Sequence, residues 1–385
     1  MKSTRTLGIL TAVTGGIILL AAMAAPPTVF EWDLPPGFPA PRVPADNPMS
    51  NAKVLLGRHL FYDLRLSADQ SISCAPCHIQ ASAFSDPRAH PVGVTGESHP
   101  RGSMSLANVG YAAVLTWANP VHRRLENQAL VPMFGETPVE MGLAGMEREV
   151  IERLTAEPRY QTLFPAAFPG DTAPVSIPNV TRALAAFQRT LISGRSPYDR
   201  FEAGDASAMS PAAQRGLELF NSERLECFHC HGGFNFSGST DFEGKGLVEI
   251  EFHNNGLYNL DGNGAYPKSN QGIYEITGNP DDMGRFKAPT LRNIEVTAPY
   301  MHDGSLATLD AVIEHYRRGG TLTAHGPNAG DGAESPLTSP FVPGFRLSEA
   351  EKADLIAFLI SLTDRGFLND PRFSDPWPKP FELPR

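Results

Sequence analysis

The chain carries Cys74-Ala75-Pro76-Cys77-His78 and, further along, Cys227-Phe228-His229-Cys230-His231. Both stretches have the pattern C-x-x-C-H, and together they use all four cysteines of the sequence. Two thiols at this spacing can form thioethers to the vinyl groups of a haem, while the adjacent histidine supplies a nitrogen to the iron. The pattern predicts two covalently bound haem c groups.

Other uses of these cysteines are two disulfides, a C-x-x-C redox pair and a zinc site built from two knuckles. A single copy of the motif would leave these uses open. Two copies with no fifth cysteine favour haem, because c-type haem is attached outside the cytoplasm and the chain begins with an export signal.

The N-terminus has the features of a cleaved signal peptide. Lys2 and Arg5 precede an apolar stretch over residues 7–20, and Ala22-Met23-Ala24 forms a small-x-small cleavage site. The stretch is short for an uncleaved anchor, which needs about 20 apolar residues. We expect residues 1–24 to be removed, which leaves a periplasmic protein with no membrane segment.

Composition limits the fold and the partners. The chain has 385 residues, 41% hydrophobic and 19% charged, enough for one large or two mid-sized globular domains. Its 35 glycines and 35 prolines indicate long loops. A net charge of −10 without any basic run argues against a nucleic-acid partner.

Each haem motif follows a similar helical ending, residues 57–61 in one case and 216–220 in the other, which indicates a duplicated unit. Ser50 and Ser210 are the expected N-caps, the second followed by a proline that fits the first helical turn. We therefore expect a mainly α fold of two cytochrome c-like haem domains with long irregular loops. The N-terminal domain is predicted over residues 25–205 and the C-terminal domain over residues 206–385.

Two segments of the second domain have clear patterns. A helix is predicted from Ser348, where Glu351 completes a capping box and apolar residues follow at helical spacing up to Leu362. Residues 232–285 are rich in glycine and asparagine with little periodicity, so we expect an irregular loop around the second haem.

The residues opposite the two proximal histidines decide what the haems can do. A haem that only carries electrons usually has both axial positions filled, whereas one that reacts with peroxide keeps a position open or openable. Several methionines, the remaining histidines and several tyrosines could fill the sixth position. The residue types alone do not choose among them.

Several stretches resemble the bacterial di-haem cytochrome c peroxidases and their MauG branch. They are 125–129 (LENQA), 138–141 (PVEM), 196–201 (SPYDRF), 286–293 (FKAPTLRN) and 297–304 (TAPYMHDG). The similarity runs from about residue 51 to residue 363. Within this family, 115–120 (LTWANP) and the loop over residues 255–274 are most similar to the MbnH group of MauG relatives, which are encoded beside methanobactin genes.

The resemblance implies an axial ligand for the second haem. In this family that ligand is a methionine in ordinary peroxidases and a tyrosine in the MauG branch, and here the matching residue is Tyr316. A phenolate is a hard anionic donor that lowers the potential of iron. The alternative is that Tyr316 only packs in an apolar helical stripe, in which case Met301 or His315 is the fallback ligand.

At the first haem, the resemblance implies that hydrogen peroxide reacts in the N-terminal, peroxidatic domain. His90 and His99 lie in the loop after the first motif, but neither has the family's usual spacing, so we expect an open distal site. Glu140 matches the family's distal glutamate and Gln128 its hydrogen-bonding neighbour, with two extra residues between them. Glu140 would otherwise be read as a solvent-facing carboxylate near a turn.

The resemblance also assigns residues between the two haems. Trp117 matches the aromatic residue that lies between them and shortens the electron step, the alternative being an ordinary core tryptophan. Asn108, with the main-chain carbonyls of Thr297 and Pro299, matches a calcium site whose hard oxygen ligands suit that ion. A structural asparagine is the alternative there.

The resemblance implies a function. A MauG-type enzyme uses hydrogen peroxide to form a high-valent di-haem state and oxidises a residue of a bound partner; in the MbnH group, a tryptophan of the copper-binding protein MbnP becomes kynurenine. One alternative is a cytochrome c peroxidase that takes electrons from a small cytochrome c or cupredoxin. Another is a non-catalytic di-haem electron carrier.

One departure from the family concerns the exit of oxidising equivalents. MauG has a surface-leading tryptophan two residues before the first cysteine of its second motif, where this chain has Leu225. The route or the docking site must therefore differ. Trp32 and Trp377 are candidates only if they fold back onto the domains.

Overall fold

The computed structural model describes residues 30–378, so the predicted signal peptide lies outside the described residues. Within that range none of the helices is long and apolar enough to span a membrane. The α-helices are α1 (Asn51–Phe61), α2 (Leu125–Gln128), α3 (Leu130–Phe134), α4 (Glu147–Ala156), α5 (Tyr160–Ala167), α6 (Ile177–Arg189), α7 (Pro197–Glu202), α8 (Pro211–Phe220), α9 (Cys227–Cys230), α10 (Tyr274–Thr277), α11 (Leu309–Arg318), α12 (Glu349–Ser361) and α13 (Arg365–Leu368). The strands β1 (Leu322–Thr323) and β2 (Gly330–Asp331) pair antiparallel.

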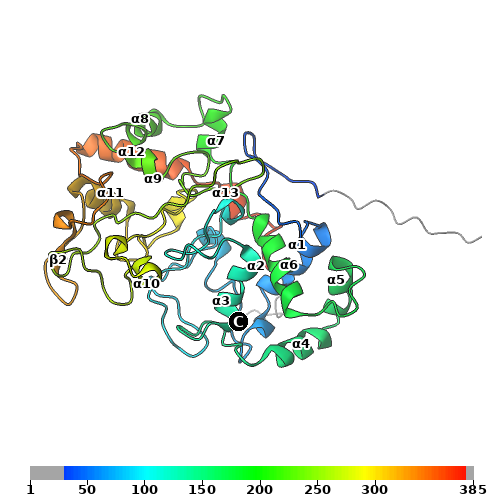
Figure 1. Cartoon of the computed structure of the whole chain (residues 1–385). Coiled ribbons are helices and arrows are strands. Elements are labelled where there is room, and N and C mark those ends of the chain that lie inside the picture. The colour runs from blue at the N-terminus through cyan, green and yellow to red at the C-terminus, as the bar shows by residue number, and fades with distance from the viewer. Residues whose placement is uncertain (1–29, 379–385) are drawn as a thin grey trace, which may run out of the picture.

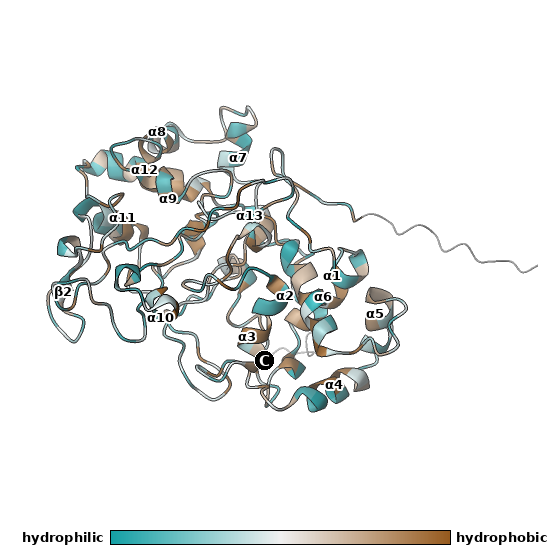
Figure 2. Ribbon diagram, in the orientation of Figure 1, coloured by the Kyte–Doolittle hydropathy of each residue, from teal (hydrophilic) through white to brown (hydrophobic). Residues whose placement is uncertain are grey.

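The helices gather in two lobes (Figure 1). Helices α1 to α6 form one lobe, and α7, α8, α9, α11 and α12 form the other. The prediction of a mainly helical fold with long loops is confirmed, and residues 232–285 are irregular chain and turns apart from α10 and a short 3₁₀ helix over residues 280–282. In Figure 2 the ribbon of α3 has the colour of hydrophobic residues, whereas that of α4 is mostly hydrophilic.

Helix caps explain where the main helices begin. The side chain of Ser50 accepts a hydrogen bond from the Lys53 amide at the start of α1, and Ser210 accepts one from Ala213 at the start of α8. Ser348 and Glu351 form the predicted capping box of α12. These side chains satisfy amide groups that a helix leaves free at its N-terminus.

The two lobes are built around matching helix pairs, α1 with α6 and α8 with α12. Glycine lets each pair approach closely: a Cβ on Gly57 would lie 1.9 Å from the Ala183 carbonyl oxygen, and one on Gly216 would lie 2.0 Å from that of Asp354. The same contact in both lobes supports the prediction of a duplicated unit.

The hydrophobic cores do not follow a simple cut at residue 205. Tyr198 and Phe201 of α7 pack in the second core, while Phe367, Phe373 and Trp377 return to the first. The boundary at residue 205 stays a prediction; in the described chain α7 packs with the second core, and residues 367–377 return to the first. The sequence did not indicate this because the returning segment is short and carries no helical period of its own.

Candidate active site

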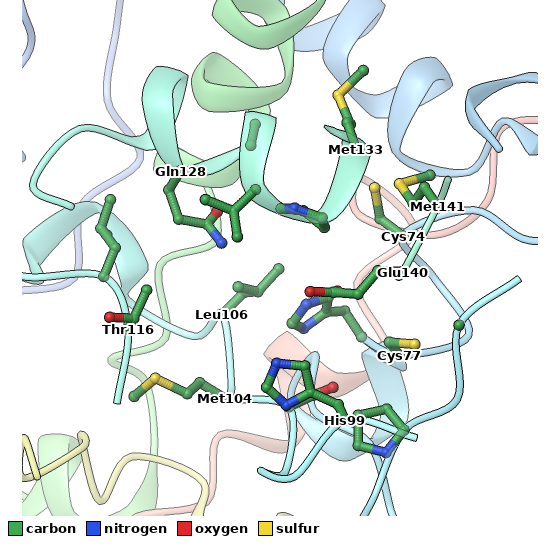
Figure 3. A pocket seen from close by; sticks show the side chains of 18 of the residues that line it. Cys74, Cys77, His99, Met104, Leu106, Thr116, Gln128, Met133, Glu140 and Met141 are labelled. Atoms are coloured by element: carbon green, nitrogen blue, oxygen red, sulfur yellow. The ribbon is translucent and has the colours of Figure 1, made fainter. Parts of the chain in front are cut away.

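The first haem motif lies directly after α1. The Cys74 amide donates to the Phe61 carbonyl at 3.2 Å, and neither Cys74 nor Cys77 is in a disulfide. Figure 3 shows both thiols at the wall of a cavity of about 420 Å³ that His78 also lines. The His78 Nδ1 atom lies 2.8 Å from the Phe84 carbonyl oxygen, to which it can donate. This leaves Nε2 with the lone pair that a metal requires.

The second motif repeats this arrangement. Cys227 and Cys230 bound the short helix α9, and the Nδ1 atom of His231 lies 3.2 Å from the Phe236 carbonyl oxygen. Phe84 and Phe236 both have positive φ, 59° and 48°, which turns each carbonyl toward its histidine. Burial lowers the pKa of His78 and lowers that of His231 to about 4, so both rings stay neutral and able to bind a metal.

The second cavity, of about 200 Å³, fits a bound group with polar edges. The buried Nε2 atoms of His253 and His302 belong to residues of its wall and make no hydrogen bond among the described residues, although a Glu251 carboxylate oxygen lies 3.6 Å from that of His253. Buried polar atoms are rarely left in this state. Together with two unpaired thiols and a neutral histidine, they form the donor set that a covalently attached haem would complete.

Gln128 and Glu140 line the first cavity together (Figure 3), so the two extra residues between them do not separate them. Gln128 ends α2 and Glu140 follows α3, and residues 131–133 and 137–139 between them also line the cavity. Burial raises the pKa of the Glu140 carboxyl above its ordinary value. A carboxylate in this setting can exchange a proton nearer to neutral pH than an exposed one.

The two loop histidines differ in position. His99 lines the first cavity, and its Nδ1 accepts a hydrogen bond from the Arg101 amide at 3.1 Å. His90 is exposed, with its Nδ1 3.1 Å from the His99 carbonyl oxygen, and is not part of the cavity wall. That the distal side of the first haem is open stays a prediction. Of the two histidines, only His99 lines the first cavity.

Trp117 lines both cavities and is the one residue that their walls share within the described chain. Its indole Nε1–H donates to the Gly102 carbonyl at 2.8 Å, and its own carbonyl accepts from the Lys287 amide at 2.8 Å. It packs with a third apolar cluster, which contains Phe286 and Met301 and lies apart from the cores of the two lobes. An aromatic ring is therefore held between the two cavities.

Tyr316 lines the second cavity from α11, as do Leu309, Val312 and Ile313 of the predicted helical stripe. Burial raises the pKa of the Tyr316 phenol to about 12. Of the fallback ligands, His315 is not on the cavity wall, and its Nδ1 lies 2.7 Å from the Thr321 hydroxyl oxygen. Met301 is on the wall, but its sulfur accepts a hydrogen bond from Asn255 at 3.4 Å.

The calcium ligands stay a prediction. Asn108 is buried, and its amide oxygen accepts a hydrogen bond from the Ser193 amide at 2.8 Å. Asn293 makes the equivalent contact with the Asp364 amide at 2.8 Å in the other lobe. The structure therefore gives Asn108 a structural use, while Thr297 and Pro299 lie in the turn after residues 294–296.

Possible exit residues for oxidising equivalents occupy distinct places. Leu225 is buried on the wall of the second cavity. Trp377 does fold back: its Nε1–H donates to the His59 carbonyl at 3.0 Å, and its ring packs against Tyr160. Trp32 packs edge-on against Phe30 near the start of the described chain.

Three of the polar residues on the cavity walls that sequence reasoning missed stand out. His122 lines the first cavity, and Lys287 and His302 line the second. Their signal in the sequence was weak: a lone lysine in an apolar stretch is the only one of the three with an unusual setting.

Comparison with known proteins places the chain in a family. A family model described as di-haem cytochrome c peroxidase matches residues 51–207. The cytochrome-c peroxidase IdrP1 of Denitromonas iodatirespirans is 36% identical over 374 residues, 91% of this chain and 92% of that protein. The methylamine utilization protein MauG of Methylorubrum extorquens is 36% identical over 321 residues, 83% of this chain and 80% of MauG. The chain belongs to the di-haem cytochrome c peroxidase (MauG) family.

Solved structures agree with this membership. The crystal structure of a MauG-like protein associated with microbial copper homeostasis has a TM-score of 0.89 and 48% identity, covering 91% of this chain and 100% of that one. The di-haem peroxidase BthA of Burkholderia thailandensis, at 19% identity and a TM-score of 0.66 over 86% of this chain and 91% of its own, shares the fold. As a member of this family, the protein is a haem peroxidase-type oxidoreductase. The family implies two haem c groups, which the two C-x-x-C-H motifs and their cavities fit.

Proposed function

We propose that the protein is a periplasmic MauG-type enzyme that uses hydrogen peroxide to oxidise a tryptophan of a copper-binding partner protein. The observation that carries the proposal is Tyr316 on the wall of the second cavity, where the resemblance places the sixth ligand of the haem. A phenolate ligand stabilises oxidised iron, whereas the thioether of an ordinary peroxidase favours the reduced state.

In this proposal the four cysteines would attach two haems, His78, His231 and Tyr316 would hold them, and the haems would supply the redox chemistry of the reaction. Gln128 orients hydrogen peroxide in the first cavity by hydrogen bonding. The Glu140 carboxylate takes a proton from one peroxide oxygen and returns it to the departing oxygen. Its partly buried position supports this role because burial raises its pKa.

Trp117 has the task of exchanging electrons between the two sites. Its place on both cavity walls supports this role, since an oxidisable ring divides one long electron step into two shorter ones. Both haem sites can then share the oxidation, and a partner protein can give up electrons to them without entering a cavity. The calcium ion of the family remains part of the proposal through Asn108, Thr297 and Pro299.

The partner is proposed from the solved structure of a MauG-like protein associated with copper homeostasis, which this chain matches at 48% identity. The resemblance to the MbnH group adds the proposed substrate, a copper-binding protein of the MbnP type with a tryptophan that is converted to kynurenine. The alternative is a cytochrome c peroxidase fed by a small donor protein. The 36% identity with the cytochrome-c peroxidase IdrP1 supports this second candidate function.

The test is to add one equivalent of hydrogen peroxide to the purified diferric protein and to follow its visible and near-infrared absorption. We expect both haem signals to change without prior reduction, and the oxidised protein to persist. In Tyr316→Phe we expect the second haem to lose its ligand-dependent absorption in the untreated protein and the oxidised state to decay faster.

Two results would overturn the proposal. If wild-type protein reacts only after one haem has been reduced, it is a cytochrome c peroxidase. If neither peroxide nor cyanide binds at all, it is an electron carrier. The partner is tested separately, by incubating the peroxide-treated enzyme with candidate copper-binding proteins and mapping mass changes on their tryptophans.

A further inference from the structure

Lys287 is a buried lysine with few contacts. The residue is only 7% exposed and lies on the wall of the second cavity. Among the described residues the Nζ atom has one acceptor, the Val114 carbonyl oxygen at 3.3 Å. A lysine ammonium has three N–H donors, so most of its hydrogen-bonding capacity is unused among the described residues.

The charge of Lys287 also has no partner in the chain. None of the ion pairs among residues 30–378 includes it. Glu226 is the one carboxylate on the wall of the second cavity within the described chain, and it lies 2.6 Å from His229 instead. Buried charges in proteins are normally paired, because moving an unpaired ion out of water is very unfavourable.

Lys287 is not simply a neutral amine. Burial lowers its pKa to about 8, which still leaves the protonated form in the majority at neutral pH. A nearby anion would raise this pKa further. The unused donors and the missing counter-charge therefore point to an anion that occupies the cavity.

We propose that Lys287 is a positioning residue that binds a propionate carboxylate of the haem in the second cavity. The same residue also fixes the segment between the two cavities, because its main-chain amide donates to Trp117 and its side chain to Val114. One residue thus couples the placement of the second haem to the placement of Trp117. This inference rests on the haems of the family and is independent of which protein is oxidised.

A positive charge next to a haem carboxylate has an electrostatic consequence. It favours the reduced iron, which carries one positive charge less than the oxidised iron. Removing the charge should therefore lower the reduction midpoint of the second haem. The first haem should respond less, because Lys287 is absent from the wall of the first cavity.

The experiment is a spectroelectrochemical titration of the purified di-haem protein. We compare wild type with Lys287→Met and Lys287→Arg, and with Lys268→Met as a matched control that removes the same charge from an exposed site. We expect one of the two midpoints to fall in Lys287→Met while the other changes little. Lys287→Arg should remain near wild type, and Lys268→Met should leave both midpoints unchanged.

Unchanged midpoints in a fully haem-loaded Lys287→Met protein would overturn the proposal. Equal shifts of both midpoints would also overturn it, since they would indicate a general electrostatic effect. If Lys287→Met does not accumulate with both haems attached, Lys287→Gln keeps hydrogen-bond donors without the charge and carries the same expectation.

Discussion

At the scale of single residues, Glu140 shows how position sets the chemistry of a common side chain. Its carboxyl lines the first cavity close to the first haem motif, and burial is the one cause that shifts its pKa upward. Glu136, four residues earlier, is exposed in the turn that precedes it. The two carboxylates of this loop therefore have different surroundings, and only Glu140 is placed to act on a substrate.

Replacing Glu140 by glutamine should slow the reaction with hydrogen peroxide by about 10²–10⁴-fold, since an amide cannot shuttle the proton. In wild type the rate should fall as the pH drops through the pKa of Glu140, because only the ionised carboxylate accepts a proton. That fall should lie at higher pH than for an ordinary carboxyl, since burial raises this pKa. Stopped-flow absorption over a pH series measures both effects.

Glu136→Gln is the control for this experiment and should react like wild type at every pH. A Glu140→Gln protein that keeps both haems and reacts at the wild-type rate would remove Glu140 from the proton transfer. Gln128 would then be the remaining polar side chain of the predicted pair.

At the scale of elements, the two lobes repeat one helix crossing. Gly57 of α1 and Gly216 of α8 occupy equivalent contacts, and in each the space for a Cβ is taken by main-chain atoms of the partner helix. Main chain in a helix cannot move aside as a flexible side chain can. The crossing therefore requires glycine for close approach, and each haem motif begins soon after that crossing.

Gly216→Ala should separate α8 from α12 and destabilise the second lobe by about 1–3 kcal/mol, the usual range for overpacking a tight contact. Gly246→Ala is a matched control, because a Cβ there would meet nothing within 4 Å and its φ is not positive. Denaturant unfolding of the haem-loaded proteins measures the difference. Equal midpoints for the two variants would show that the lobe relaxes around the added methyl group.

The elements that the sequence predicted are those with a cap and a long apolar period. The helix that begins after Ser348 and the helical endings before the two motifs have both features, and the structure contains them. The short helices α2 and α3 have only four and five residues and no side-chain cap. Their conformation depends on packing around the cavity, which sequence periodicity does not report.

At the scale of the whole molecule, the cavity walls combine distant parts of the chain. The motif cysteines and histidines could be found from local spacing alone. Lys287 and His302 could not, because their significance depends on unused hydrogen-bonding capacity in a cavity whose wall combines residues from 117 to 359. Glu140, Trp117 and Tyr316 became candidates only through family resemblance, and the structure adds that each of them lies on a cavity wall.

Trp117 joins the two lobes functionally if electrons pass through it. Trp117→Phe should slow the redistribution of an electron between the two haems, because a phenyl ring is much harder to oxidise than an indole. The variant also loses the hydrogen bond to Gly102, a cost of about 1 kcal/mol that should leave both haems attached. Flash reduction with less than one electron per molecule, followed by absorption at both haems, measures the redistribution rate.

Trp377→Phe is the control for this experiment. It makes the same chemical change and also removes an indole hydrogen bond, but on the first core, away from the walls of both cavities. We expect Trp377→Phe to redistribute electrons at the wild-type rate. If Trp117→Phe does so as well, the haems exchange electrons directly, and Trp117 serves only to close the space between the two cavities.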